Sequence, residues 1–208
     1  MLTVRQYAVG PFQSNAYLVW DVAPGEALLV DAGAEAPRLL RELEEHDLEL
    51  TAILQTHAHA DHIAALPEIV AATGAPVYLH PDARPMLLNA KENLSAFAGI
   101  PITAPVETLA VTEADELNLL GRKIQIYYTP GHAPGSLCYH FVDDGIVFTG
   151  DALFAGSIGR TDFPGGSYDL LVDCIKRKLL VLPDETQVYS GHMGPTTIGH
   201  ERETNPFL

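Results

Sequence analysis

The sequence has few cysteines, few basic residues and no long hydrophobic run. Its two cysteines, Cys138 and Cys174, lie far apart in a chain of 208 residues and form no CxxC pair. This spacing argues against a disulfide framework and against a cysteine-rich structural zinc site. No apolar stretch approaches the roughly 18 residues that a membrane-spanning helix needs, and residues 1–5 do not resemble a signal peptide. We therefore expect a reduced, cytoplasmic protein without a membrane partner.

The scarcity of basic residues also limits the partners of the chain. Lys and Arg number 12 against 27 Asp and Glu, which gives a net charge of −15. Nucleic acids and anionic membrane surfaces both select basic patches, so neither is expected as a partner. An anionic substrate would be repelled at long range, unless bound metal ions and a nearby basic residue reversed the field at the site.

Length and patterning predict one domain over residues 1–208, because 47% of the residues are apolar and can form a sizeable core. Strands are predicted at residues 3–9, 15–21, 27–31, 51–55, 77–79, 123–129, 137–142, 145–149 and 187–189. Helices are predicted at residues 37–46, 63–72, 82–90 and 167–180, the last with Ser167 as its N-cap. Residues 91–105 are expected to form a loop. Two sheets with helices outside are the natural packing of these elements.

The strongest local signal is a cluster of histidines directly after the predicted strand at residues 51–55. Within six consecutive positions the sequence places His57, His59, Asp61 and His62. Imidazole and carboxylate are the usual ligands of borderline divalent metals, and no packing requirement asks for such a cluster. The cluster therefore predicts a metal site.

Three further loops carry residues of the ligand type, each directly after a predicted strand. His132 follows Pro-Gly, Asp151 follows Thr-Gly and His192 follows Ser-Gly. Ligands at strand ends can converge on one edge of a rigid sheet. Five histidines and two aspartates are too many for one tetrahedral ion. They suit two ions bridged by a carboxylate and a hydroxide.

The motifs Thr-His-Ala-His-Ala-Asp-His, Pro-Gly-His, Thr-Gly-Asp and Gly-His together resemble the metallo-β-lactamase superfamily across essentially the whole chain. Within it, residues 150–154, 159–162 and the tail from Gly191 are similar to glyoxalase II-like hydrolases (hydroxyacylglutathione hydrolases) of the short, single-domain bacterial type. The resemblance implies an α+β protein with the four-layer αβ/βα sandwich of that family.

The resemblance also implies a role for each candidate ligand. His57, His59 and His132 would hold one metal ion, Asp61, His62 and His192 would hold a second, and Asp151 would bridge them. Two divalent ions per chain are expected, zinc first, with iron or manganese as alternatives. The implied reaction is attack of a metal-bridging hydroxide on a thioester carbonyl, with Asp61 and Asp151 as catalytic residues.

The likeness to glyoxalase II is incomplete on the substrate side. Those enzymes carry a C-terminal helical domain that helps to bind glutathione, and we expect this chain, which ends at Leu208, to lack it. Gly194 stands where they have a glutathione-contacting Tyr. Arg160 does align with their basic residue for the substrate carboxylate, and a guanidinium suits that task. The expected substrate is a small thioester, with a glutathione conjugate as the first candidate. The sequence gives no oligomeric state.

Three alternatives remain open at this point. Persulfide dioxygenases share the fold, and they hold a single iron(II) through residues equivalent to His57, His132 and Asp151. A β-lactamase or lactonase would need the same hydroxide, and a non-catalytic module would use the metal only for structure. The tail after His192 favours the hydrolase, and the excess of ligands disfavours a structural site. Asp31 is expected behind the ligands, and His200 and Glu201 are expected to brace the His192 loop.

Overall fold

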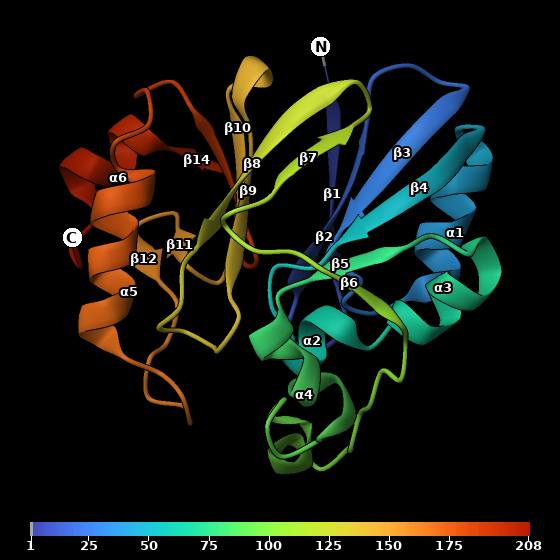
Figure 1. Cartoon of the computed structure of the whole chain (residues 1–208), viewed down its shortest axis with the longest axis horizontal. Coiled ribbons are helices and arrows are strands. Elements are labelled where there is room, and N and C mark those ends of the chain that lie inside the picture. Colours follow the sequence, from blue (N-terminus) through green and yellow to red (C-terminus); the bar gives the residue numbers. More distant parts are fainter. Residues whose placement is uncertain (1) are drawn as a thin grey trace.

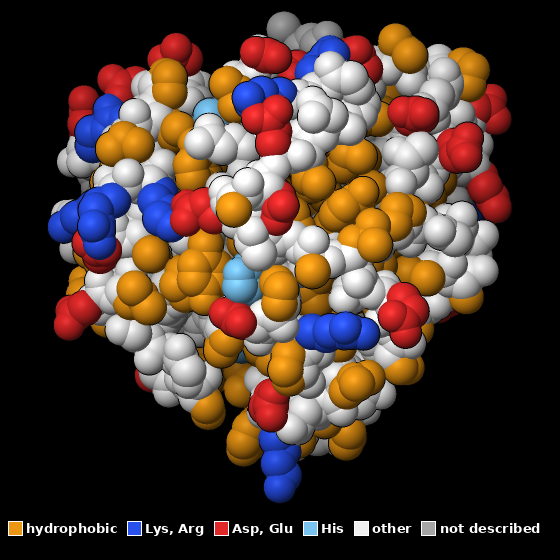
Figure 2. All heavy atoms as spheres, viewed as in Figure 1, with side chains coloured by type: hydrophobic (Ala, Val, Ile, Leu, Met, Phe, Trp, Pro, Cys, Tyr) orange, Lys and Arg blue, Asp and Glu red, His pale blue; other side chains and the backbone are white. Residues whose placement is uncertain are grey.

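The computed structural model describes residues 2–208 and shows two facing β-sheets with helices on both outer faces (Figure 1). This is the four-layer αβ/βα sandwich of the α+β class that the sequence predicts. None of the helices within residues 2–208 is long and apolar enough to cross a membrane. Acidic side chains are scattered over the face drawn in Figure 2, as the net charge of −15 leads one to expect.

The first sheet has its strands in sequence order from β1 to β6. They are β1 (Thr3–Val9), β2 (Ser14–Trp20), β3 (Gly25–Val30), β4 (Leu48–Leu54), β5 (Val77–Leu79) and β6 (Thr108–Ala110). β1, β2 and β3 pair antiparallel, whereas β3 to β6 pair parallel. Parallel strands need crossover connections. Two of these contain α1 (Ala36–Glu45) and α3 (Leu66–Thr73), which cover the outer face of the sheet (Figure 1).

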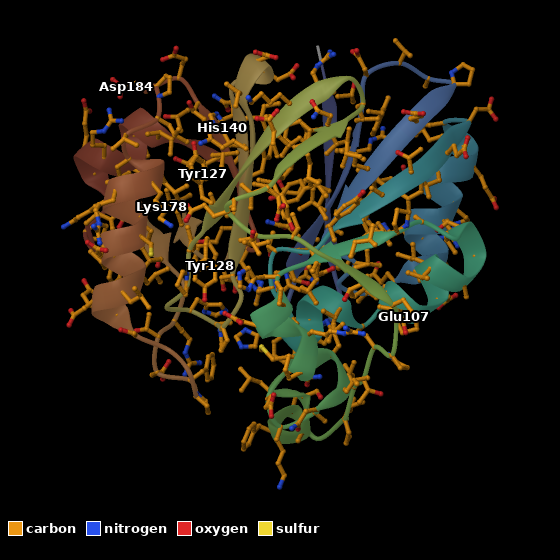
Figure 3. All side chains as sticks on the ribbon, in the orientation of Figure 1. Glu107, Tyr127, Tyr128, His140, Lys178 and Asp184 are labelled. Carbon is orange, nitrogen blue, oxygen red and sulfur yellow. The ribbon has the colours of Figure 1, made fainter. Side chains whose placement is uncertain are left out.

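The second sheet has the order β14-β13-β10-β9-β8-β7. Its strands are β7 (Glu116–Leu119), β8 (Arg122–Tyr128), β9 (Leu137–Phe141), β10 (Ile146–Gly150), β13 (Gln187–Ser190) and β14 (Thr196–Thr197). Its outer face is covered by α5 (Tyr168–Cys174), a turn of π-helix (Ile175–Leu179) and α6 (Ile198–Thr204). Lys178 on the π-helical turn reaches back to the sheet and donates a 2.8 Å hydrogen bond to the Tyr128 carbonyl (Figure 3).

Alternation along the strands builds three hydrophobic layers. On β2, Leu18 packs toward the helices of the first sheet, while Tyr17 and Val19 pack between the two sheets. On β10, Phe148 lies between the sheets and Val147 packs under α5. Successive side chains of a strand point to opposite faces, so each strand contributes to two layers. The sheets are thereby held rigidly face to face.

Most predicted elements are confirmed with shifts of one to three residues, but two helices differ. The helix predicted at residues 63–72 is two helices, α2 (Ala60–Ile63) and α3, and α3 has Pro67 in its first turn, where proline is tolerated. The helix predicted at 82–90 is a short 3-10 turn (Pro81–Ala83) followed by α4 (Arg84–Leu88). The Ser167 cap is confirmed, since its Oγ accepts from the Leu170 amide at 3.4 Å.

The sequence analysis missed several short elements. These are β6, β7, β14, α6 and a two-stranded hairpin of β11 (Leu153–Phe154) and β12 (Ser157–Ile158). β6 and β7 are short edge strands of three and four residues and are largely exposed, so they lack the apolar run that marks a buried strand. Residues 91–105 form a loop as predicted, apart from one 3-10 turn (Ser95–Ala98).

Candidate metal centre

The carboxyl ends of four strands place the candidate ligands together. In the second sheet β9 runs antiparallel to both β8 and β10, and β10 runs parallel to β13. The three strands β8, β10 and β13 therefore run in one direction. The loops that carry His132, Asp151 and His192 all leave at the same edge of the sheet. The loop after β4, in the first sheet, brings His57 and its neighbours to this edge from the other side.

The structure brings all seven predicted residues into one cluster. His57, His59 and His132 form a buried first set, whose potential ligand atoms lie within 4.8 Å of one another. Asp61, His62 and His192 form a second set with the same spread. Asp151 lies between the two sets. Its Oδ1 is 3.4 Å from Nε2 of His62, and its Oδ2 is 3.5 Å from Nε2 of both His132 and His192.

Three buried atoms of this cluster have no hydrogen-bond partner among residues 2–208. They are Nε2 of His57, Nε2 of His62 and Oδ1 of Asp151. Buried polar atoms without partners are rare in folded proteins, and each needs a physical reason. Nitrogen and carboxylate lone pairs that converge in this way suit borderline divalent cations. The residues present therefore fit metal ions.

A single buried carboxylate orients one histidine in each set. Asp31 Oδ2 accepts hydrogen bonds from Nδ1 of His62 at 2.9 Å and from Oγ1 of Thr56 at 2.7 Å. The Thr56 hydroxyl lies 3.1 Å from Nδ1 of His57. When Nδ1 of a histidine donates, its Nε2 carries the lone pair that a metal needs. Asp31 thus lies behind the ligands, as predicted.

His132 is oriented by the main chain instead. Its Nδ1 donates to the carbonyl oxygen of Arg160 at 2.7 Å, which turns Nε2 toward Asp151. The residue before Arg160 must be glycine, because a Cβ at Gly159 would lie 1.9 Å from the Asp151 carbonyl oxygen. Close packing of two main-chain segments thereby fixes the ring.

The sequence analysis missed the residues that hold the histidine loop itself. Gln55 is fully buried, and its Nε2 donates to the carbonyls of His57 at 3.1 Å and of His62 at 2.7 Å. The Phe163 ring packs edge-on against His59, with ring centroids 5.9 Å apart. The only signal for Gln55 in the sequence is a polar residue at the end of an otherwise apolar strand.

The two sets differ in their electrostatics. Burial, followed by the charges of neighbouring imidazoles, lowers the pKa of His57 far below its usual value and that of His59 to about 3. Burial acts in the same direction on His62, but Asp61, Asp151 and Asp31 outweigh it and raise its pKa to about 10. At neutral pH His57 and His59 of the first set therefore offer neutral imidazoles, while His62 of the second set carries a proton that a cation must displace.

The Asp61 carboxylate remains ionised. Its burial would raise its pKa, but the charges of His62 and His192 and a hydrogen bond from His192 lower it below the usual range. Its Oδ2 lies 3.3 Å from Nε2 of His192 and 3.7 Å from Nε2 of His62. Asp61 is also the least buried ligand candidate besides His192, which places it at the mouth of the cluster.

The remaining candidates lie around this centre. Glu201 is fully buried, and it accepts from Oγ1 of Thr196, the Gly156 amide and Nδ2 of Asn205. It thus ties the chain after His192, at Thr196, to the turn of the β11–β12 hairpin, at Gly156, and these bonds do not reach His192 itself, whose loop it was expected to brace. The same prediction is wrong for His200, which is exposed and whose ring lies beside the Thr204 hydroxyl.

Comparison with known proteins agrees with this geometry. A model of the metallo-beta-lactamase superfamily matches residues 9–192. The probable metallo-hydrolase YqgX of Bacillus subtilis is 40% identical over 98% of this chain and 96% of its own length. The hydroxyacylglutathione hydrolase GloC of Haemophilus influenzae is 38% identical over 100% of this chain and 98% of its own.

Solved structures of similar proteins share this fold. The BLEG-1 B3 metallo-beta-lactamase has a TM-score of 0.95 at 40% identity and 99% coverage of both chains. The protein TTHA1623, in a di-iron-bound form, has a TM-score of 0.87 at 41% identity, covering 98% of this chain and 100% of its own. ETHE1 from Myxococcus xanthus has a TM-score of 0.80 at 33% identity, covering 98% and 83%. The chain described here therefore belongs to the metallo-beta-lactamase superfamily.

Proposed function

We propose that the protein is a binuclear metal-dependent hydrolase that cleaves thioesters of the S-acylglutathione type. The observation that carries this proposal is the position of Asp151, whose carboxylate lies within 3.5 Å of histidines from both sets. In this proposal the first set would hold one ion, the second set would hold another and Asp151 would bridge them. Zinc is the first candidate for both ions, with iron or manganese as alternatives.

Divalent ions bound here would supply a hydroxide near neutral pH and would polarise a carbonyl oxygen. The chain itself supplies the rest. Asp31, through His62 and Thr56, fixes the directions of the ligands. The ionised Asp61 carboxylate at the mouth would accept a hydrogen bond from the attacking hydroxide and orient it toward the substrate carbonyl. A thiolate leaves readily, so the reaction requires no strong general acid from the protein.

The substrate preference rests on the relatives and on Arg160. GloC carries the name of a hydroxyacylglutathione hydrolase and aligns with the whole chain. The carbonyl oxygen of Arg160 contacts His132, and the guanidinium lies over the ring of Phe163, which itself contacts His59. A guanidinium at this position can bind a carboxylate of the substrate while the thioester lies over the metal ligands. Thiols that carry carboxylates, such as glutathione, are called acidic thiols below.

A mononuclear iron dioxygenase acting on persulfides is the second candidate. Oxygen activation uses two histidines and one carboxylate on one face of the iron. His57, His132 and Asp151 offer such a triad, and the likeness to ETHE1 at 33% identity supports this candidate. The ligand residues do not separate the two candidates, because both groups of enzymes retain them. The tail after His192 (Gly194–Gly199) favours the hydrolase.

Metal content separates the two candidates. We would purify the protein anaerobically without chelator or His-tag and measure metal per chain by elemental mass spectrometry. Two ions per chain together with hydrolysis of an acylglutathione support the hydrolase. One iron per chain, with oxygen uptake on glutathione persulfide and no thioester hydrolysis, overturns it. Asp151→Asn is expected to lose the activity while it remains folded, and unchanged turnover would contradict any catalytic role for the cluster.

A further inference from the structure

Arg160, the basic residue beside the metal cluster, is already paired with a carboxylate of its own loop. Its Nε donates to Asp162 Oδ1 at 3.0 Å and its Nη2 donates to Asp162 Oδ2 at 2.8 Å. The two parallel bonds form a bidentate fork. Both side chains are 66% exposed, so the pair is open to solvent and to ligands. The guanidinium carbon lies 4.3 Å above the centre of the Phe163 ring.

We propose that Asp162 determines specificity by reducing the preference of the site for acidic thiols, so that thioesters of neutral thiols are accepted as well. This inference rests on the proposed hydrolase function and refines its substrate class. It assigns to Asp162 the role of an internal competitor for Arg160. A substrate carboxylate must either displace Asp162 or bind beside it.

The geometry of the guanidinium supports this role. The group has two edges that match a carboxylate with two hydrogen bonds, one formed by Nε and Nη2 and the other by Nη1 and Nη2. Asp162 occupies the first edge. Among residues 2–208, Nη1 has no protein partner, so the second edge remains available to a ligand. Asp162 therefore weakens the capture of a carboxylate without abolishing it.

The charge balance acts in the same direction. The carboxylate of Asp162 offsets the positive charge of Arg160 within hydrogen-bonding distance, and the chain carries −15 overall. An acidic thiol that approaches from solvent therefore meets a neutral pair on a negative protein, not an isolated cation. Removal of the Asp162 charge leaves the positive charge of Arg160 unpaired. The guanidinium lies over the Phe163 ring, and that ring contacts His59 of the metal cluster.

The opposite role is that Asp162 holds Arg160 in the position that binds substrate. The two roles predict opposite signs. If Asp162 competes, its neutralisation strengthens the binding of acidic thiols. If Asp162 only positions Arg160, its neutralisation weakens that binding. The exposure of both side chains favours competition, because exposed pairs are weak and exchange readily.

The test compares two substrates that share the same thioester and differ in whether the carboxyls of the thiol are charged. We would measure kcat and KM of the metal-loaded enzyme for an acylglutathione and for the same thioester with both glutathione carboxyls esterified. We divide kcat/KM for the acylglutathione by kcat/KM for the diester. In Asp162→Asn this ratio is expected to rise about fivefold, because KM for the acylglutathione falls. The size of the change corresponds to the weak energy of an exposed ion pair. Added salt should abolish the rise. Asp169→Asn, an exposed charge change in the first turn of α5, is the matched control and should leave the ratio unchanged.

Arg160→Gln, alone and combined with Asp162→Asn, completes a double-mutant cycle. The ratio should fall in this variant, and adding Asp162→Asn to it should have no further effect, since Asp162 acts through Arg160. An unchanged or lower ratio in Asp162→Asn alone overturns the proposal. If the wild-type enzyme cleaves no thioester, the proposed function fails separately. In that case the affinities of the metal-loaded protein for glutathione and for its diester are measured by calorimetry. Asp162→Asn is expected to strengthen the binding of glutathione relative to that of the diester.

Discussion

Nδ1 of His62 donates a hydrogen bond to the carboxylate of Asp31 at 2.9 Å, in a place where both side chains are buried. The same carboxylate receives the Thr56 hydroxyl, which lies beside Nδ1 of His57. One side chain therefore sets the direction of a histidine in each candidate ligand set. A change at Asp31 should reach both sets at once, although Asp31 has no place in the proposed coordination.

Asp31→Asn is expected to lower the affinity for metal by about 10- to 100-fold, since residues that orient metal ligands typically contribute this much. Oδ1 of Asp31 also accepts from the Thr56 amide, so in the variant an NH2 group must face either that amide or both His62 and the Thr56 hydroxyl. The affinity would be measured by competition with a chromophoric chelator. Glu26→Gln, on the exposed side of β3, is the matched control. Wild-type affinity in folded Asp31→Asn would contradict the orienting role.

Gly191→Ala should damage the metal site while Gly194→Ala should not. A Cβ at Gly191 would lie 2.0 Å from Oδ1 of Asp151 and 2.9 Å from Cε1 of His62, whereas a Cβ at Gly194 has no neighbour within 4 Å. The added methyl group must displace two candidate ligands. Metal per chain after gel filtration measures the effect. Equal metal content in the two variants would show that the loop can yield at Gly191.

The stability of the chelator-treated protein should be highest near pH 6.5 and should fall on both sides. The pKa of His62 is raised to about 10 in the folded protein, so its contribution is complete below the unfolded pKa of about 6.5 and is lost as the pH rises toward 10. The pKa of His59 is lowered to about 3, and that of His57 is also lowered. Unfolding therefore takes up protons below about pH 6.5, and stability falls with acid.

Urea unfolding of the chelator-treated protein between pH 4 and pH 10 would measure this profile. In metal-loaded protein the alkaline fall should disappear, because an ion replaces the proton on His62. A stability that rises steadily from pH 7 to pH 10 without metal would be incompatible with the raised pKa of His62.

Glu201→Gln should destabilise the protein by about 1–3 kcal/mol, the range for a buried group that loses a hydrogen-bond partner. The buried carboxylate accepts three hydrogen bonds, and an amide offers an NH2 group where an acceptor is required. Glu203→Gln lies on the same helix but is exposed, and it should change the free energy of unfolding little. Equal stability of the two variants in urea would argue against Glu201 as a brace.

The sequence predicted the layers and the ligand cluster for different reasons. Strands such as β2 and β10 are recognisable as short, nearly continuous apolar runs because both of their faces are buried. The ligand cluster is visible because histidine is rare and four strand ends carry it or aspartate in a short motif. The partner of His132 could not be predicted, because it is a carbonyl oxygen, and every residue has one. The pairing of Arg160 with Asp162 was also missed, because the conformation of an exposed loop leaves no periodic pattern.

The candidate ligand sets draw on both halves of the chain. His57 and His59, which follow β4 of the first sheet, form a set with His132 from the second half of the chain. Asp61 and His62 form the other set with His192. When only the first sheet has been synthesised, each set therefore lacks one histidine. The second set cannot be completed before residue 192 is synthesised. Both sets are complete only when the loops after β8 and β13 lie against the loop after β4.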